Sequence, residues 1–132
     1  MIVLLDTHVL LFWLGGDPRL TRAQADAIGS ASADEPLLVS DISLWEVATL
    51  VSLGRIRLRR PLRDWLEAAV APPLVRRMSI SPAVAAEVTE LPDTFHRDPA
   101  DRIIVATART AGAAVVTGDS RIIDSRLVET IV

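Results

Sequence analysis

The sequence predicts an α/β domain in which helices cover both faces of a mainly parallel sheet. Half of the residues are hydrophobic and only 4% are aromatic, a mixture that suits helices packed on a buried sheet. Short runs rich in Val, Leu and Ile alternate along the chain with segments that carry helix-capping residues. The 132 residues contain no repeat, low-complexity tract or linker, and we therefore expect a single domain over residues 1–132.

Five short apolar runs predict the strands of this sheet. The first is a run of Ile, Val and Leu that ends at Asp6, without the polar alternation that marks a half-exposed strand. The predicted strands cover residues 2–5, 37–40, 74–80, 113–117 and 127–132.

Start and stop signals place helices between these strands. Thr21, Ser40 and Ser81 are residue types that commonly cap a first turn, and glycines follow several of the apolar segments. The predicted helices cover residues 7–14, 22–32, 41–53, 61–70 and 99–111, with a further one beginning at Pro82.

Composition excludes several classes of protein. The net charge of −3 argues against a simple electrostatic nucleic-acid binder, and all fourteen basic residues are arginine. Without Lys or Cys, the chain has no catalytic lysine, catalytic thiol, disulfide or zinc–thiolate site. The N-terminal stretch lacks a basic region and is interrupted by Asp6 and His8, so it predicts neither a signal peptide nor a membrane span, and a cytoplasmic location is expected.

Four acidic residues stand where the predicted strands end or the following helices begin. In parallel α/β sheets these positions meet at one edge, which is where functional groups gather. Asp6 ends the first strand, Glu46 lies early in the helix after the second, Asp101 is in the first turn of its helix, and Asp119 follows a strand by one glycine. We therefore expect these four carboxylates to face the same edge.

A structural explanation also exists for most of these acids, and it is weakest for Asp6. Asp98 stands before Pro99 and is expected to be an N-cap, which leaves Asp101 at the third helical position, where an acid also completes a cap or favours the helix dipole. Asp119 suits a turn, whereas Asp6 has no obvious ion-pair partner nearby in sequence.

Glu46 has two alternatives. It completes a capping box if Ser43 is the cap, and lies in the second helical turn if Ser40 is the cap.

Together, four carboxylates at one edge repel one another unless a cation lies among them. An oxygen ligand set without Cys or paired His suits Mg²⁺ or Mn²⁺, and such a site favours metal-assisted phosphodiester hydrolysis. His8 and His96 are far apart in sequence and are interpreted as local hydrogen-bonding residues. A P-loop and a nucleophile elbow are absent, and receiver domains and aspartyl-phosphate phosphatases depend on a lysine that this chain lacks.

The segments LLDTH, SLWEVATLVSLGRI, HRDPADRIIVATA and VVTGDSRI resemble, in this order, the motifs of PIN-domain ribonucleases, most closely the VapC toxins of bacterial toxin–antitoxin pairs. The resemblance implies a three-layer α/β/α fold and hydrolysis of RNA by a metal-activated water. It implies a homodimer and a small antitoxin partner as well. The residues that it assigns to the Mg²⁺ or Mn²⁺ site are Asp6, Glu46, Asp101 and Asp119, supported by Thr7 and Thr117.

Two surfaces have open alternatives. The arginines of RIRLRR, Arg55, Arg57, Arg59 and Arg60, either contact RNA phosphates beside the metal site or form a solvated face, as do Arg76 and Arg77. Apolar residues of the early helices either line a groove for the antitoxin or belong to the core: Leu11, Trp13, Leu14 and Trp45.

The function also has open alternatives. The chain is then either a catalytically silent PIN-like binding module or a PIN nuclease that acts in RNA processing or on DNA.

Overall fold

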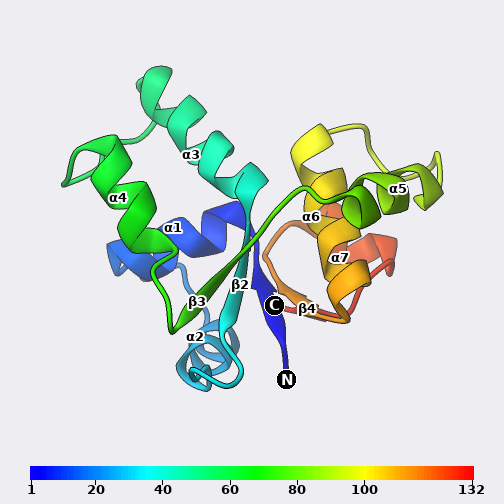
Figure 1. Ribbon diagram of the computed structural model, residues 1–132, viewed down its shortest axis with the longest axis horizontal. Coiled ribbons are helices and arrows are strands. Elements are labelled where there is room, and N and C mark those ends of the chain that lie inside the picture. Colours follow the sequence, from blue (N-terminus) through cyan, green and yellow to red (C-terminus); the bar gives the residue numbers. More distant parts are fainter.

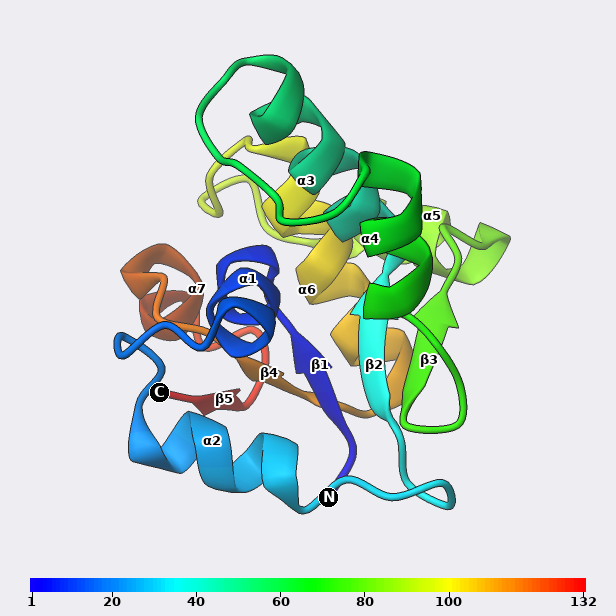
Figure 2. The same cartoon turned by 90° about the vertical axis from the view of Figure 1, so that its left-hand side faces the viewer.

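The computed structural model describes residues 1–132 (Figure 1). It contains a five-stranded sheet in the order β3-β2-β1-β4-β5 (Figure 2). Every pair of neighbouring strands is parallel, which confirms the expected α/β class. The strands are β1 (Val3–Leu5), β2 (Leu37–Ser40), β3 (Val75–Met78), β4 (Ala114–Val116) and β5 (Thr130–Ile131). All five strands lie within the segments predicted from sequence.

Seven helices connect and flank these strands. They are α1 (Thr7–Gly15), α2 (Arg22–Gly29), α3 (Asp41–Ser52), α4 (Leu62–Ala69), α5 (Pro82–Glu90), α6 (Pro99–Ala111) and α7 (Ser120–Ser125). The side chains of Thr21, Ser40, Ser81 and Asp98 each accept a backbone hydrogen bond at a helix start, so these four caps are confirmed.

Some elements are shorter than predicted, such as α2, which ends at Gly29 and not at residue 32, and two further details differ. Pro61 precedes α4 as its N-cap and is not its first helical residue, because its ψ of 143° is extended. The short helix α7 was not expected, since its six residues are too few to show a hydrophobic period.

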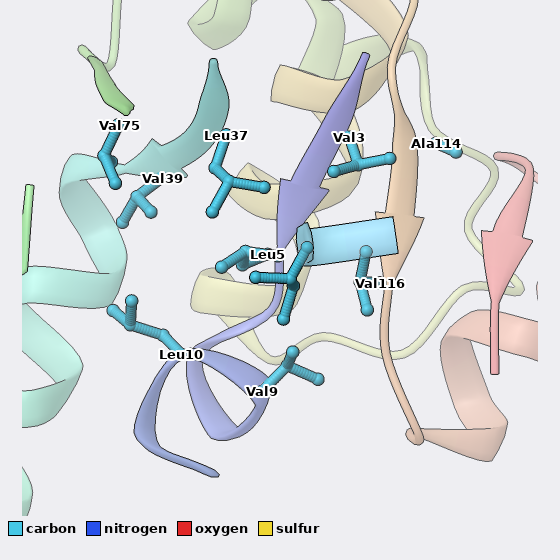
Figure 3. Packing of buried hydrophobic residues seen from close by; sticks show 10 residues of the cluster. Val3, Leu5, Val9, Leu10, Leu37, Val39, Val75, Ala114 and Val116 are labelled. Carbon is cyan, nitrogen blue, oxygen red and sulfur yellow. The ribbon is translucent and has the colours of Figure 1, made fainter. Parts of the chain in front are cut away.

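The sheet separates two layers of helices (Figure 2). Because successive residues of a strand point to opposite faces, Val3 and Leu5 pack with α1 and α2, whereas Leu4 packs with α6. Figure 3 shows the first of these clusters, in which side chains of β1, β2 and β4 meet Val9 and Leu10 of α1. Burial on both faces explains why β1, β2 and β4 are uninterrupted apolar runs.

The strand order reverses beside β1, since β2 and β3 continue to one side and β4 and β5 to the other. In open α/β sheets a crevice forms at such a point, outside the carboxyl ends of the strands. Asp6 directly follows β1 and Thr117 directly follows β4, so both lie at this edge. None of the helices combines the length and the apolar character that a membrane crossing requires.

Candidate active site

Asp6 is held by residues from both central strands. Its Oδ1 accepts from the backbone N–H of Thr7 at 2.8 Å, which makes it the N-cap of α1, and its Oδ2 accepts from Oγ1 of Thr117 at 2.7 Å. The side chain of His8 supplies the partner that the sequence did not reveal, with Nδ1 at 3.4 Å from Oδ2. Asp6 is only 3% exposed, and these contacts hold its carboxylate at the carboxyl edge of the sheet.

The ring of His8 is oriented by the loop after β4. Its Nε2 accepts a hydrogen bond from the backbone N–H of Gly118 at 3.0 Å, which leaves the proton of the neutral ring on Nδ1, facing Asp6. His8 is therefore a local hydrogen-bonding residue, as predicted.

Glu46 reaches the same edge from the second turn of α3. Ser40 caps this helix, so the alternative in which Ser43 is the cap is wrong. Oγ1 of Thr7 donates to Oε1 of Glu46 at 2.5 Å, and it lies 2.8 Å from Oγ of the buried Ser43. Thr7 thus joins α1 to α3 and orients the Glu46 carboxylate, and Ser43 is a supporting residue that sequence analysis treated only as a possible cap.

Asp101 lies in the first turn of α6 and is 6% exposed. Oδ2 of this carboxylate is 3.1 Å from Nε2 of His96, but the geometry is not that of a hydrogen bond, and neither atom has another hydrogen-bond partner. Asp98, by contrast, is exposed and accepts from the backbone N–H of Ala100 at 3.0 Å. The two aspartates, three positions apart, therefore have different surroundings.

Electrostatics couple the acids at this edge. Burial raises the pKa of Asp101 to about 7, and the negative charges of Asp6, Asp98, Asp119 and Glu46 contribute to the increase. Burial also raises the pKa of Glu46, although the hydrogen bond from Thr7 opposes the increase. Both carboxyl groups are thus partly buried near other acids, where desolvation and like charges disfavour ionisation.

Asp119 caps α7 and has a cationic partner. Its Oδ1 accepts from the backbone N–H of Arg121 at 2.9 Å, and Nη2 of the same arginine lies 3.1 Å from Oδ2. Burial raises the pKa of Asp119, but the hydrogen bonds and charge of Arg121 outweigh burial and hold the pKa below its usual value. Nη2 of Arg121 also lies 3.6 Å from Oδ2 of Asp101, a contact that sequence analysis missed because nothing near VVTGDSRI marks the arginine as different from a surface residue.

The described side chains bring the four acids to one edge, yet no three acidic or histidine side chains lie close enough together to hold a metal ion as they stand. Their chemistry nevertheless fits a hard divalent cation, which prefers carboxylate oxygens. Asp101 offers a buried oxygen without a hydrogen-bond partner, and its pKa is raised by burial and, to a smaller extent, by the negative charges around it. A cation at this edge would relieve both conditions.

A second surface lies at the other end of α1. A groove of about 580 Å³ runs between α1, the segment after α3, and α4. Its apolar lining includes Leu11, Leu14 and Trp65, and Arg57, Arg59 and Arg60 lie along it. Arg55 is exposed just after α3.

The structure separates the four apolar residues that were considered for a groove. Leu11 and Leu14 line it, whereas Trp13 packs against the core cluster and Trp45 lies on α3, away from the groove and 63% exposed. Arg76 is at the opposite edge of the sheet, beside the segments that lead into β2 and β3, and Arg77 pairs with Asp41 at 2.9 Å.

Comparison with known proteins agrees with this architecture. The PIN domain family model matches residues 3–126. Ribonuclease VapC22 of Mycobacterium tuberculosis is 43% identical over 120 residues, which cover 91% of this chain and 88% of the relative. The chain belongs to the PIN domain family, and within that family it is a homologue of a VapC ribonuclease.

Solved structures show the same fold at low sequence identity. VapBC2 from Rickettsia felis, bound to a promoter DNA fragment, superposes with a TM-score of 0.72 at 15% identity, covering 98% of this chain and 97% of that chain. FitAcB from Neisseria gonorrhoeae gives a TM-score of 0.70 at 20% identity, with 99% and 97% covered. The PIN-like three-layer arrangement expected from the motifs is therefore confirmed.

Proposed function

We propose that this protein is a Mg²⁺- or Mn²⁺-dependent endoribonuclease, the toxin of a toxin–antitoxin pair, formed by one PIN domain over residues 1–132. The observation that carries the proposal is the buried Asp101, whose carboxylate lies among four other acids and has an oxygen without a hydrogen-bond partner. The 43% identity to a protein named Ribonuclease VapC22 supports RNA as the substrate. Retention of mutually repelling acids argues against a silent binding module.

The residues proposed to hold the metal are Asp6, Glu46, Asp101 and Asp119. Bound among them, the metal would lower the pKa of a water molecule and offset the charge that develops on the phosphate oxygens. The threonines have positioning roles: Thr117 orients Asp6 with a hydrogen bond of 2.7 Å, and Thr7 orients Glu46. Because carboxylates rotate readily, such hydrogen bonds keep the oxygens directed toward one point.

Purified protein is expected to cleave single-stranded RNA in Mg²⁺ or Mn²⁺ and to lose this activity in EDTA. The Asp101→Asn variant, purified in the same way, controls for contaminating ribonucleases because it removes a proposed ligand at constant shape. Undiminished cleavage in EDTA, or equal cleavage by the variant, would contradict the proposal. A parallel assay on single-stranded and duplex DNA separates an RNA-specific enzyme from a nuclease of broader substrate range.

The groove beside α1 is the proposed site for a segment of the antitoxin. Several solved structures of this fold are VapBC complexes, and one is described as a toxin–antitoxin complex from Klebsiella pneumoniae. The apolar lining with Leu11, Leu14 and Trp65 suits the apolar face of a helix, and the neighbouring arginines suit acidic side chains. We also propose that the toxin is a homodimer, as the family resemblance implies; sedimentation of the purified chain tests this.

The arginines Arg55, Arg57, Arg59 and Arg60 are proposed to contact RNA phosphates as well. This proposal is supported by their position, because α1 leads from Asp6 to the groove that these arginines border. At about 1.5 Å per residue, Leu14 is about 12 Å from Asp6 along the helix axis. A partner seated in the groove would then cover part of the RNA path, so that RNA binding and partner binding would exclude one another.

A further inference from the structure

Arg121 is the arginine that contacts the acidic site directly. Its Nη2 lies 3.1 Å from Asp119 and 3.6 Å from Asp101, and no other arginine forms an ion pair with any of the four acids. Arg102 follows Asp101 in sequence but is buried. Its Nη1 donates hydrogen bonds to the backbone oxygens of Phe95 and His96, so Arg102 supports the loop before α6.

The guanidinium of Arg121 is held on one side only. Nε and Nη2 contact the Asp119 carboxylate at 3.3 and 3.1 Å, while Nη1 forms no hydrogen bond with the protein. The side chain is 58% exposed and borders a depression of about 420 Å³ together with Thr94, His96 and Ser125. Arginine carries five N–H donors, so most of its donor capacity is directed to solvent beside the acids.

A metal cation bound among the acids would compete with the guanidinium of Arg121 for the same carboxylate oxygens. Oδ2 of Asp101, the oxygen without a hydrogen-bond partner, is also the oxygen of that carboxylate that pairs with Nη2 of Arg121 at 3.6 Å. If Asp101 held a divalent ion, the positive charge of the ion would repel the guanidinium of Arg121 and weaken its pairing with that oxygen. Once it no longer contacts Asp101, the planar guanidinium of Arg121 matches the oxygens of a phosphate in geometry and charge.

We infer that Arg121 is a substrate-positioning residue, which leaves Asp101 when the metal binds and then holds an RNA phosphate beside the cleaved bond. The inference rests on the proposed ribonuclease function and deepens it. It also answers an electrostatic difficulty, because RNA must approach an edge formed by five acids. The guanidinium of Arg121 provides a positive charge at that edge. This charge attracts the RNA phosphate, whereas the carboxylates repel it.

The experiment compares Arg121→Gln, Arg121→Lys and Arg76→Gln with the wild-type protein. Arg76 is a matched control since it is also exposed, loses the same charge, and lies at the opposite edge of the sheet. Steady-state cleavage of a fluorescent mixed-sequence RNA in Mg²⁺ gives kcat and KM. Binding of the same RNA in Ca²⁺, another oxygen-preferring cation, is measured over a range of salt concentrations.

Arg121→Gln is expected to raise KM roughly tenfold, the effect of one lost charge-assisted hydrogen bond, with less than about threefold change in kcat. It should also flatten the salt dependence of binding by about 0.7 per lost phosphate contact on a single strand. Arg121→Lys, which keeps the charge, should restore the salt slope in full and KM in part, and Arg76→Gln should match the wild type.

Two results would overturn the inference. An Arg121→Gln variant with unchanged KM and salt slope would leave the arginine as a clamp on Asp119 alone. A loss of kcat at constant KM, unrestored by Lys, would indicate structural support of the acids instead of phosphate binding. Wild-type protein that does not cleave RNA in Mg²⁺ would contradict the proposed function itself, so the two failures are distinguishable.

Discussion

The two ends of helix α1 lie in opposite chemical environments. At its N-terminus, the capping residue Asp6 is buried near other acids at the carboxyl ends of β1 and β4. Near its last turn, Leu11 and Leu14 border an apolar groove with arginines along it. One short helix therefore links the proposed catalytic crevice to the proposed partner site.

The comparison shows two ways in which a fold produces a binding surface. The acidic crevice is built from positions that the topology of a parallel sheet brings together, so its members come from four distant segments. The groove is built from neighbouring helices and the segment after α3, and its character depends on which side chains remain exposed after packing. Changes at the crevice should affect chemistry, whereas changes at the groove should affect association.

The largest expected effect separates Asp101 from the fold. Asp101→Asn should reduce RNA cleavage by at least about 100-fold. Loss of a residue that only orients a metal ligand lowers activity by up to about 100-fold, and this variant changes a proposed ligand itself. Its stability without metal should be unchanged or higher, because like-charge repulsion is relieved and the opposing helix-dipole loss is only ~0.3–1 kcal/mol. Cleavage assays and urea unfolding of the same preparation measure both quantities. An active but destabilised variant would assign Asp101 to helix capping alone.

The second prediction concerns pH. Asp101 has a pKa of about 7 in the folded protein against an ordinary 3.8, so between these values the folded state holds a proton that the unfolded state lacks. This group therefore favours folding most at low pH, and that contribution is lost as pH rises from about 4 to 7. The difference in unfolding free energy between wild type and Asp101→Asn should follow this trend.

Metal binding should show the opposite trend, because the ion must displace that proton. Its affinity should rise by about tenfold per pH unit up to a pH near 7 and then level off. Mn²⁺ titrations at several pH values measure the effect. A Mn²⁺ affinity independent of pH below 7 would show that Asp101 is not a ligand.

A smaller effect is expected at the groove. Replacing Arg59 and Arg60 with Ala should weaken RNA binding and flatten its salt dependence by roughly 0.7 per lost contact, while cleavage at saturating RNA continues. Salt titrations with the Arg76→Gln variant as control measure the slope. An unchanged slope would remove these arginines from the RNA path and leave them to the partner alone.

The smallest effect should come from Asp98. Asp98→Ala loses the side-chain bond to the Ala100 N–H and should destabilise the protein by ~0.5–2 kcal/mol, with substantial cleavage retained. Urea unfolding and cleavage assays are again sufficient. If this variant were inactive at wild-type stability, Asp98 would belong to the catalytic group.

Most of the fold could be predicted because its signals are local. The caps Thr21, Ser40 and Asp98 and the uninterrupted apolar runs lie in consecutive residues, and parallel topology follows from their alternation. The grouping of the four acids also followed from topology. The expected homodimer, and the choice of the groove arginines between RNA and a protein partner, depend on association with other molecules. The fold of one chain does not determine such association.

The family resemblance named Thr7 and Thr117 as supporting residues, but the carboxylate that each of them contacts could not be predicted. The bonds from Thr117 to Asp6 and from Thr7 to Glu46 join residues 111 and 39 positions apart. The contact of Arg121 with Asp101 depends on the short helix α7, which has no sequence period to reveal it. Exposure was also not predicted, since Trp13 and Trp45 were both considered for the groove, but Trp13 packs against the core and Trp45 is 63% exposed.

The central claim is that these acids form a metal site, and calorimetric titration with Mn²⁺ tests it most directly. Wild-type protein should bind Mn²⁺ at pH above 7, Asp101→Asn and Glu46→Gln should each lose most of that affinity, and Asp26→Asn, an exposed acid on α2, should bind as the wild type does. Wild-type protein that takes up no Mn²⁺, or site variants that bind it as tightly as Asp26→Asn, would contradict the account.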